Sequence, residues 1–227
     1  MFRSRWFLLI LLITLVALSA CSALGVMDSV TGEVTAESEE TQSVIVPGVP
    51  TLIVSHFAGN VTIRDGEADK ITANLTRQSR LDDAAEAQAQ LDLITMEFTQ
   101  SGTDVTLSIE GRDGASQGLD AATANLELLV PPGTVLEITQ GAGNLTIEQP
   151  GSDVTVNLGA GNATVTLPED ASFNLSISGG VGNVNSDFAG VPDGGLATDI
   201  DTTIGDNPTQ TLTFNVGAGD INLNKAE

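Results

Sequence analysis

From Ser43 onward, short runs of apolar residues alternate with polar residues at every second position. Gly, Asn, Asp and Pro interrupt these runs at short intervals. Successive side chains of a β-strand point to opposite faces, so alternation with a period of two predicts many short strands, each with one buried face.

An internal repeat organises these strands around a glycine that is followed by Asn or Asp. Apolar residues occupy nineteen of the twenty positions that lie seven and five before, and two and four after, the five corner glycines; Ser186 is the exception. Gly adopts backbone angles that strain other residues, and Asn or Asp tolerates the left-handed region, so each repeat predicts a strand, a sharp corner and a second strand. The corner glycines are Gly59, Gly143, Gly161, Gly182 and Gly219.

The spacing of the repeats indicates how they assemble. The last four corner glycines recur after 18, 21 and 37 residues, and a unit of this length cannot bury its apolar face alone. We therefore predict an all-β fold of β-solenoid-like stacked coils or two facing sheets, with the Gly-Asn corners stacked along one edge. The residues expected to share its core are Leu136, Ile138, Val154, Val156, Val165, Leu175, Ile177 and Phe214.

One stretch departs from the alternation and predicts a short helix near residues 80–91. Ser79 and Asp82 provide capping side chains, and Leu81, Ala84 and Leu91 follow at helical spacing. Strands are expected to follow at residues 94–98, 105–109 and 126–130. Residues 187–210 are rich in Gly, Pro and Asp and predict a long loop with one irregular coil.

The first twenty-one residues have the form of a secretory signal. Arg3 and Arg5 precede an apolar run that extends to Leu18, and small residues follow. Leu18-Ser19-Ala20-Cys21 resembles the lipobox of bacterial lipoproteins. That resemblance implies cleavage before Cys21, a diacylglycerol on the Cys21 sulfur and acylation of its new amino group, and several acyl chains anchor a protein stably.

The alternative is an uncleaved transmembrane helix, because the apolar stretch continues to Met27 and reaches about 20 residues. Both interpretations place the chain from Asp28 onward outside the cytoplasm. We assign residues 1–20 to the signal peptide, 21–42 to the lipidated cysteine and an acidic tether, and 43–227 to the β domain.

Composition narrows the classes of function. After Cys21 the chain carries six basic and thirty acidic residues, a formal charge of −24, which disfavours nucleic acid and would attract cations or basic partners. Cys21 is the only cysteine, so no intramolecular disulfide can form. The only Trp lies in the signal and Tyr is absent, which disfavours a lectin-like surface built on these aromatic faces.

The order of motifs resembles a known family. Residues 126–134 (LELLVPPGT), the repeated Gly-Asn corners and the ending Ile204-Gly205-Asp206…Gly219-Asp220-Ile221 look like those of the bacterial putative-adhesin family, also called toast-rack domains. The resemblance spans roughly residues 43–224. It implies a β-coil domain of unknown function outside a membrane anchor, and it provides no catalytic or binding residues.

The residues that catalysis would use are scarce. His56 is the only histidine and is expected at a strand end near solvent, in a structural role. The acidic pairs Glu39-Glu40, Asp82-Asp83 and Glu169-Asp170 are expected in the tether, at the helix start and in a turn. Oxygen ligands at residues 183–187 and 199–201 leave a structural calcium site open, although the Gly-rich calcium repeat is missing. The corners lack the Lys-Ser/Thr and the helix of a phosphate loop.

These observations predict a non-enzymatic lipoprotein, with Cys21 as its lipid-attachment site and with no catalytic, cofactor-binding or metal-binding residues. It would lie outside the cytoplasm, anchored to a bacterial membrane lipid, and display an interaction domain that is adhesive and binds an envelope protein or a surface ligand. The alternatives are a sensory or regulatory lipoprotein of an envelope-stress pathway and, third, a polysaccharide-active enzyme.

Overall fold

The computed structural model describes residues 33–111, 119, 121–192, 194–195 and 199–226. In this part of the chain almost every element is a strand, and one short helix interrupts them. The elements are β1 (Ala36–Ile45), β2 (Thr51–Ala58), β3 (Val61–Asp65), β4 (Lys70–Ser79), α1 (Ala84–Leu91), β5 (Ile94–Ser101), β6 (Asp104–Gly111), β7 (Ala122–Val130), β8 (Val135–Ala142), β9 (Leu145–Glu148), β10 (Val154–Ala160), β11 (Ala163–Leu167), β12 (Phe173–Val181), β13 (Asn183–Ser186), β14 (Gly194–Gly195), β15 (Ile200–Ile204), β16 (Gln210–Ala218) and β17 (Ile221–Lys225).

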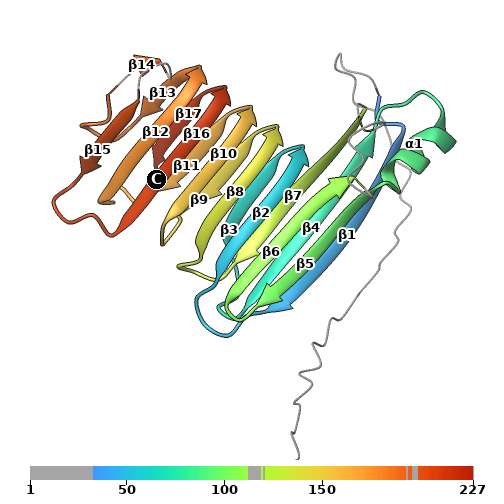
Figure 1. Cartoon of the computed structure of the whole chain (residues 1–227), viewed down its shortest axis with the longest axis horizontal. Helices are drawn as coiled ribbons and strands as arrows, with labels where there is room; N and C mark the ends of the chain where they lie inside the picture. The colour runs from blue at the N-terminus through green and yellow to red at the C-terminus, as the bar shows by residue number, and fades with distance from the viewer. Residues whose placement is uncertain (1–32, 112–118, 120, 193, 196–198, 227) are drawn as a thin grey trace, which may run out of the picture.

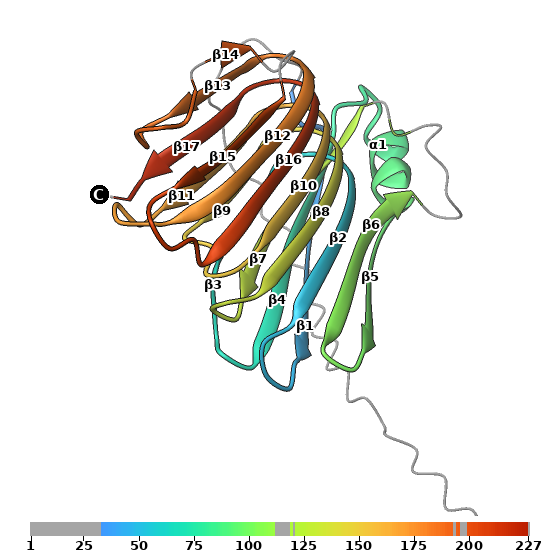
Figure 2. The same cartoon turned by 60° about the vertical axis from the view of Figure 1, so that its left-hand side comes forward.

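The strands form two long sheets that face each other (Figures 1 and 2). The nine-stranded sheet has the order β1-β4-β7-β3-β9-β11-β17-β13-β14, and the eight-stranded sheet has the order β15-β12-β16-β10-β8-β2-β6-β5. Neighbouring strands are parallel in the middle of both sheets and antiparallel at both ends. The fold is therefore all-β, and both descriptions expected from the sequence apply, because stacked coils create the two facing sheets.

Each predicted repeat forms one coil, with one strand in each sheet. Leu52, Leu136, Val154, Leu212 and Leu175 lie opposite one another on neighbouring strands, as the repeat alignment requires. The coils do not follow the order of the sequence. The last coil, β16–β17, lies between β10–β11 and β12–β13, so the final segment of the chain completes the middle of both sheets.

The space between the sheets holds one continuous apolar core. The eight residues expected to share it all belong to the same cluster, and each is at most 2% exposed. Burying a side chain of this size contributes about 1.5–3 kcal/mol, so the stacked coils supply the stability that disulfides supply in many small secreted domains. The predicted core is confirmed.

The corner glycines stack with almost no space between them. Gly59, Gly143, Gly161 and Gly219 have positive φ angles between 117° and 140°. A Cβ atom on Gly161 would lie 2.0 Å from the carbonyl oxygen of Gly143 in the next coil. The glycine is thus required both by the backbone angle and by the neighbouring coil.

A ladder of Asn and Asp side chains follows the glycines along this edge. The side-chain oxygen of Asn144 accepts a hydrogen bond from the backbone N–H of Asn162 at 3.2 Å, and that of Asn162 accepts one from Asp220 at 2.9 Å. Asn60 and Asp220 extend the same pattern to Asn144 and Asn183. The second residue of the Gly-Asn corner therefore links each coil to the next.

Two expectations about secondary structure need correction. Residues 36–42, assigned to the tether, form most of β1, because pairing with β4 gives their backbone groups partners despite the polar composition. Ser79 does not cap the helix; it ends β4, and its buried hydroxyl donates to Gln90 at 2.6 Å. The helix begins after Asp83, whose carboxylate accepts from the backbone N–H groups of Ala85 and Glu86.

Candidate functional site

The two ends of the molecule are closed differently. At one end Phe188 packs edge-on against Phe173, and the Lys225 ammonium lies 5.4 Å from the centre of the Phe188 ring. At the other end the long edge strands β1 and β5 lie beside α1 (Figure 1). The second end therefore presents two strand edges from two different sheets.

Two glutamines bridge these edge strands across one half of the opening. Gln42 of β1 donates its side-chain N–H to the carbonyl oxygen of Met96 at 3.2 Å. Gln100 of β5 donates in the opposite direction, to the carbonyl oxygen of Ile45 at 3.2 Å. The other half of the opening, toward α1, remains open.

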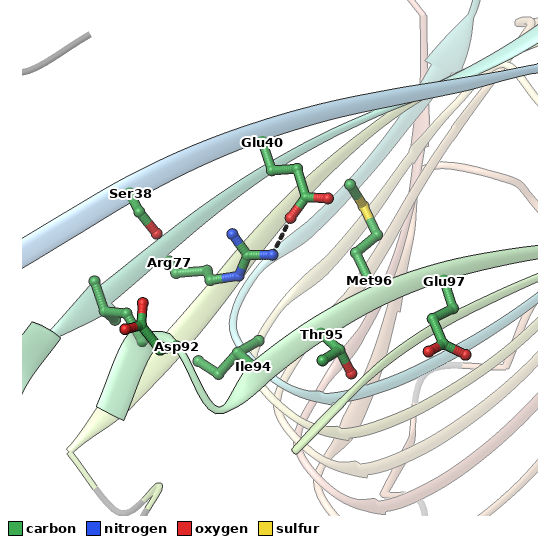
Figure 3. A pocket seen from close by; sticks show the side chains of 9 residues that line it. Ser38, Glu40, Arg77, Asp92, Ile94, Thr95, Met96 and Glu97 are labelled. Carbon is green, nitrogen blue, oxygen red and sulfur yellow. Dashed lines mark hydrogen bonds and ion pairs between the residues drawn. The ribbon is translucent and has the colours of Figure 1, made fainter. Parts of the chain in front are cut away.

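This open half is a groove of about 540 Å³, which we call the end groove (Figure 3). Its apolar lining comes from Leu91, Ile94 and Met96, which are otherwise buried in the core. Its polar lining comes from Ser38 and Glu40 of β1, Arg77 of β4, Asp92 after α1, and Thr95 and Glu97 of β5. Three carboxylates and one guanidinium give this lining an excess of negative charge.

An ion pair lies between the sheets at the end groove, in an interior that is otherwise mostly apolar. Arg77 is 9% exposed and donates through Nη2 to the Glu40 carboxylate (Figure 3). The other oxygen of Glu40 accepts from Gln42 at 2.6 Å. Arg77, Glu40, Gln42 and Met96 thus form one chain of contacts that joins both sheets. The Nε atom of Arg77 is buried and has no hydrogen-bond partner among the described residues.

The helix α1 adds negative charge to the end groove. Its C-terminus lies at the groove, where the unpaired carbonyls of a helix carry a partial negative charge. The C-cap residue is Asp92, and the last turn contains no basic residue. An acidic residue at this position is unfavourable by itself and raises the local preference for a cation.

Sequence reasoning missed this site. It placed Glu40 in the tether, whereas the structure places it on the inner face of β1. Arg77 lies on the buried side of β4 together with Ile71, Ala73 and Leu75. The alternation in β4 carried this signal, because a charged residue on the buried side of a strand requires a partner.

His56 is not near solvent, contrary to the expectation. It is 3% exposed, and its Nε2 lies 2.7 Å from the carbonyl oxygen of Ala124. Burial lowers the pKa of His56 below the ordinary value of 6.5. The neutral ring therefore donates through Nε2, and its Nδ1 has no partner among the described residues. Gln140 occupies the same place in the next coil and donates to the carbonyl oxygen of the corner residue Gly59 at 2.7 Å, whereas the carbonyl that His56 binds belongs to β7.

The other candidates for chemistry lie apart. Cys21 is outside the described residues. The pair Asp82-Asp83 precedes α1 and Glu169-Asp170 forms an exposed turn, as expected. Among the described residues, no three His, Cys, Asp or Glu side chains converge as metal ligands would. The Asp187 carboxylate, one of the possible calcium ligands, accepts from the backbone N–H of Lys225 at 3.1 Å. Within the described residues, the helix α1 is too short and too polar to cross a membrane.

Comparison with known proteins agrees with this fold. The crystal structure of a "putative cell adhesion protein" from Clostridium sporogenes is similar to 84% of this chain over its own full length, with 16% identity and a TM-score of 0.50. A "putative adhesin" from Bacteroides fragilis aligns with 85% of this chain over its full length, with 10% identity and a TM-score of 0.27. No curated protein matches the sequence.

The sequence also matches the model of a protein family over most of its length. Residues 32–187 match the N-terminal domain of toast_rack, DUF2154, and this range includes β1 to β13 and the end groove. The remaining strands belong to the same two sheets. The chain therefore belongs to the toast-rack family, as the Gly-Asn corners and the Val-Pro-Pro-Gly segment indicated.

Proposed function

We propose that this protein is a lipid-anchored, non-enzymatic lipoprotein that displays an adhesin-like interaction domain outside the cytoplasmic membrane. The observation that carries this proposal is how the repeat uses its side chains. Each coil directs its apolar residues into one core and its Thr, Asn and acidic residues to the outer faces. Such a domain acts through its exposed faces and edges.

The anchor is supported by Leu18-Ser19-Ala20-Cys21 and by the position of the first strand. β1 begins at Ala36 on an outer edge of the sheet, beside α1, so a preceding anchor would not have to pass through the core. The name of the similar structure from Clostridium sporogenes, a putative cell adhesion protein, agrees with a role in display.

The proposal can be tested in a bacterial expression host. The wild-type chain is expected to incorporate an alkyne-labelled fatty acid and to float with membranes. Protease added to spheroplasts, whose cytoplasmic membrane is intact, is expected to digest the domain. Cys21→Ala should abolish the labelling and leave an unprocessed precursor, whereas Ser22→Ala, the matched control, should behave like the wild type. Unchanged labelling of Cys21→Ala, or a domain protected inside the cytoplasm, would contradict the proposal.

A further inference from the structure

The free edge of β1 carries unused backbone hydrogen-bonding groups. Val46 donates to the carbonyl of Asp69, directly opposite in the antiparallel ladder, so the odd-numbered residues of β1 turn their N–H and C=O groups away from β4. Glu39, Thr41 and Ser43 are therefore free to pair with another strand. Such an edge is a template for strand addition unless side chains prevent it.

The end groove lies where the side chains of an added strand would point. The even-numbered residues of β1, including Ser38 and Glu40, face the space between the sheets. Every second side chain of a strand paired with β1 would face the same space and enter the groove beside them. Figure 3 shows Glu40 and Met96 on opposite sides of this opening, with Asp92 near the end of α1. The edge and the groove thus form one surface.

The chemistry of this surface selects a basic side chain. Leu91, Ile94 and Met96 line the groove where the methylene stem of a lysine or arginine would lie, and Asp92 offers a carboxylate for its charged end. On the outer face of β1, Glu37 and Glu39 would lie beside the other side chains of the added strand, where opposite charges stabilise cross-strand pairs. The C-terminus of α1 favours a cation at the same place.

Charge also decides between possible partners. A second copy of this chain would bring its own acidic edge, with Glu37 and Glu39 facing like charges, and each chain has a net charge of −22. Glu40 points inward from this edge, which further disfavours pairing between copies. A basic strand meets attraction at Glu37 and Glu39 instead, whereas Glu40 is already paired with Arg77.

We infer that β1 and the end groove bind an extended, lysine- or arginine-rich segment of a partner protein by strand addition. This inference rests on the proposed function, because it names the partner class of the displayed domain. The strand supplies backbone hydrogen bonds to Glu39, Thr41 and Ser43, and its inward basic side chain fills the groove next to Asp92.

The test uses the full-length chain in neutral detergent micelles and a fluorescent peptide of four Lys-Val repeats. A peptide with four lysines followed by four valines has the same composition and charge but cannot match the alternation of a strand. A third peptide is N-methylated at alternate residues, which removes the N–H groups along one edge. We expect the alternating peptide to bind at least tenfold more tightly than either control.

Variants of the chain test the surface itself. Glu39→Gln combined with Asp92→Asn should weaken binding about tenfold or more, whereas Glu137→Gln combined with Asp153→Asn, remote changes of equal charge, should not. Thr41→Pro removes an outward N–H and should also weaken binding, while Thr41→Val keeps that N–H and should not. Circular dichroism would verify that each variant is folded.

Equal binding of the three peptides would overturn the inference, because it would indicate attraction by charge alone. Binding of the alternating peptide that all variants retain would place its site elsewhere and overturn it as well. The same would follow if a Glu-Val peptide bound equally well or if the free chain formed dimers through β1. In each case, flotation of the wild-type chain with membranes would show separately whether the proposed lipid-anchored display survives.

Discussion

Replacement of a single corner glycine should separate two physical reasons for its presence. Gly161 has a φ of +137°, and a Cβ atom there would lie 2.0 Å from the carbonyl oxygen of Gly143. Gly102 has a φ of +68° but no atom within 4 Å of its Cβ position. Gly141 has no positive φ, yet its Cβ would lie 2.4 Å from the carbonyl oxygen of Phe57. Alanine at Gly161 tests the backbone angle and the contact together, alanine at Gly102 tests the angle alone, and alanine at Gly141 tests the contact alone.

The expected cost follows from the structure. Alanine at Gly102 adopts a left-handed conformation in open space and should cost about 1 kcal/mol. Alanine at Gly161 adds backbone strain of about 1–3 kcal/mol to a contact that forces two corners apart. That separation stretches the hydrogen bonds from Gly143 N–H to Ala160 O, at 2.9 Å, and from Asn162 N–H to the Asn144 side chain, at 3.2 Å. We expect a total of about 3 kcal/mol or more for Gly161→Ala.

Thermal unfolding followed by circular dichroism measures the difference. For a domain of this size, 1 kcal/mol lowers Tm by roughly 2–4 °C, so Gly102→Ala should lower it by a few degrees and Gly161→Ala by roughly 6–12 °C. Gly141→Ala should fall between them or near the larger value. If Gly161→Ala lowers Tm no more than Gly102→Ala, the close approach of neighbouring coils does not explain the corner glycine.

Three further predictions concern single side chains. Arg77→Leu leaves the half-buried Glu40 carboxylate without its cation and should lower the free energy of unfolding in urea by about 1–3 kcal/mol. Arg77→Leu combined with Glu40→Leu should recover most of that loss. A double variant as unstable as Arg77→Leu would contradict this. Because burial lowers the pKa of His56, the unfolded chain takes up this proton first, so the stability it contributes above pH 6.5 is lost as the pH falls below that value. His56→Gln should reduce that loss between pH 8 and about 5.5 and keep the corner bond that Gln140 makes in the next coil; an unchanged pH profile would exclude His56 as its source. Phe214→Ala should lower stability by about 3–5 kcal/mol through the cavity it leaves, and a cost below about 1 kcal/mol in the same urea assay would contradict its place in the core.

The sequence allowed the register of the coils to be predicted, because each repeat carries its own local instructions. Alternation selects the buried face, and the Gly-Asn pair sets the corner, so equivalent residues such as Leu136 and Val154 could be aligned without a structure. The helix was also predictable in place, but its cap was not. Asp83 and Ser79 are both good caps, and β4 continues through Ser79 because β1 and β7 pair with it on both sides.

The candidate site was not predictable, because it depends on neighbours that are distant in sequence. The polar composition of residues 36–42 is typical of a tether, and they form a strand because they pair with the edge of β4. Arg77 and Glu40 are 37 residues apart, and nothing local specifies that they meet between two sheets. The end groove exists because β1 and β5 are the edge strands of two different sheets and lie at the same end of the molecule.

By itself, therefore, the sequence determined the strands of the repeats, their buried faces and the chemistry of the corners, since these follow from side chains and backbone angles within one repeat. Tertiary structure alone decided the order of the coils, the burial of His56 and the groove at the end. Each repeat offers a neighbour the same kind of apolar face and corner, so the repeat pattern does not specify that β16–β17 enters between β10–β11 and β12–β13. Pairing between strands that are distant in sequence sets the order of the coils, and it leaves β1 and β5 as the two edge strands beside α1.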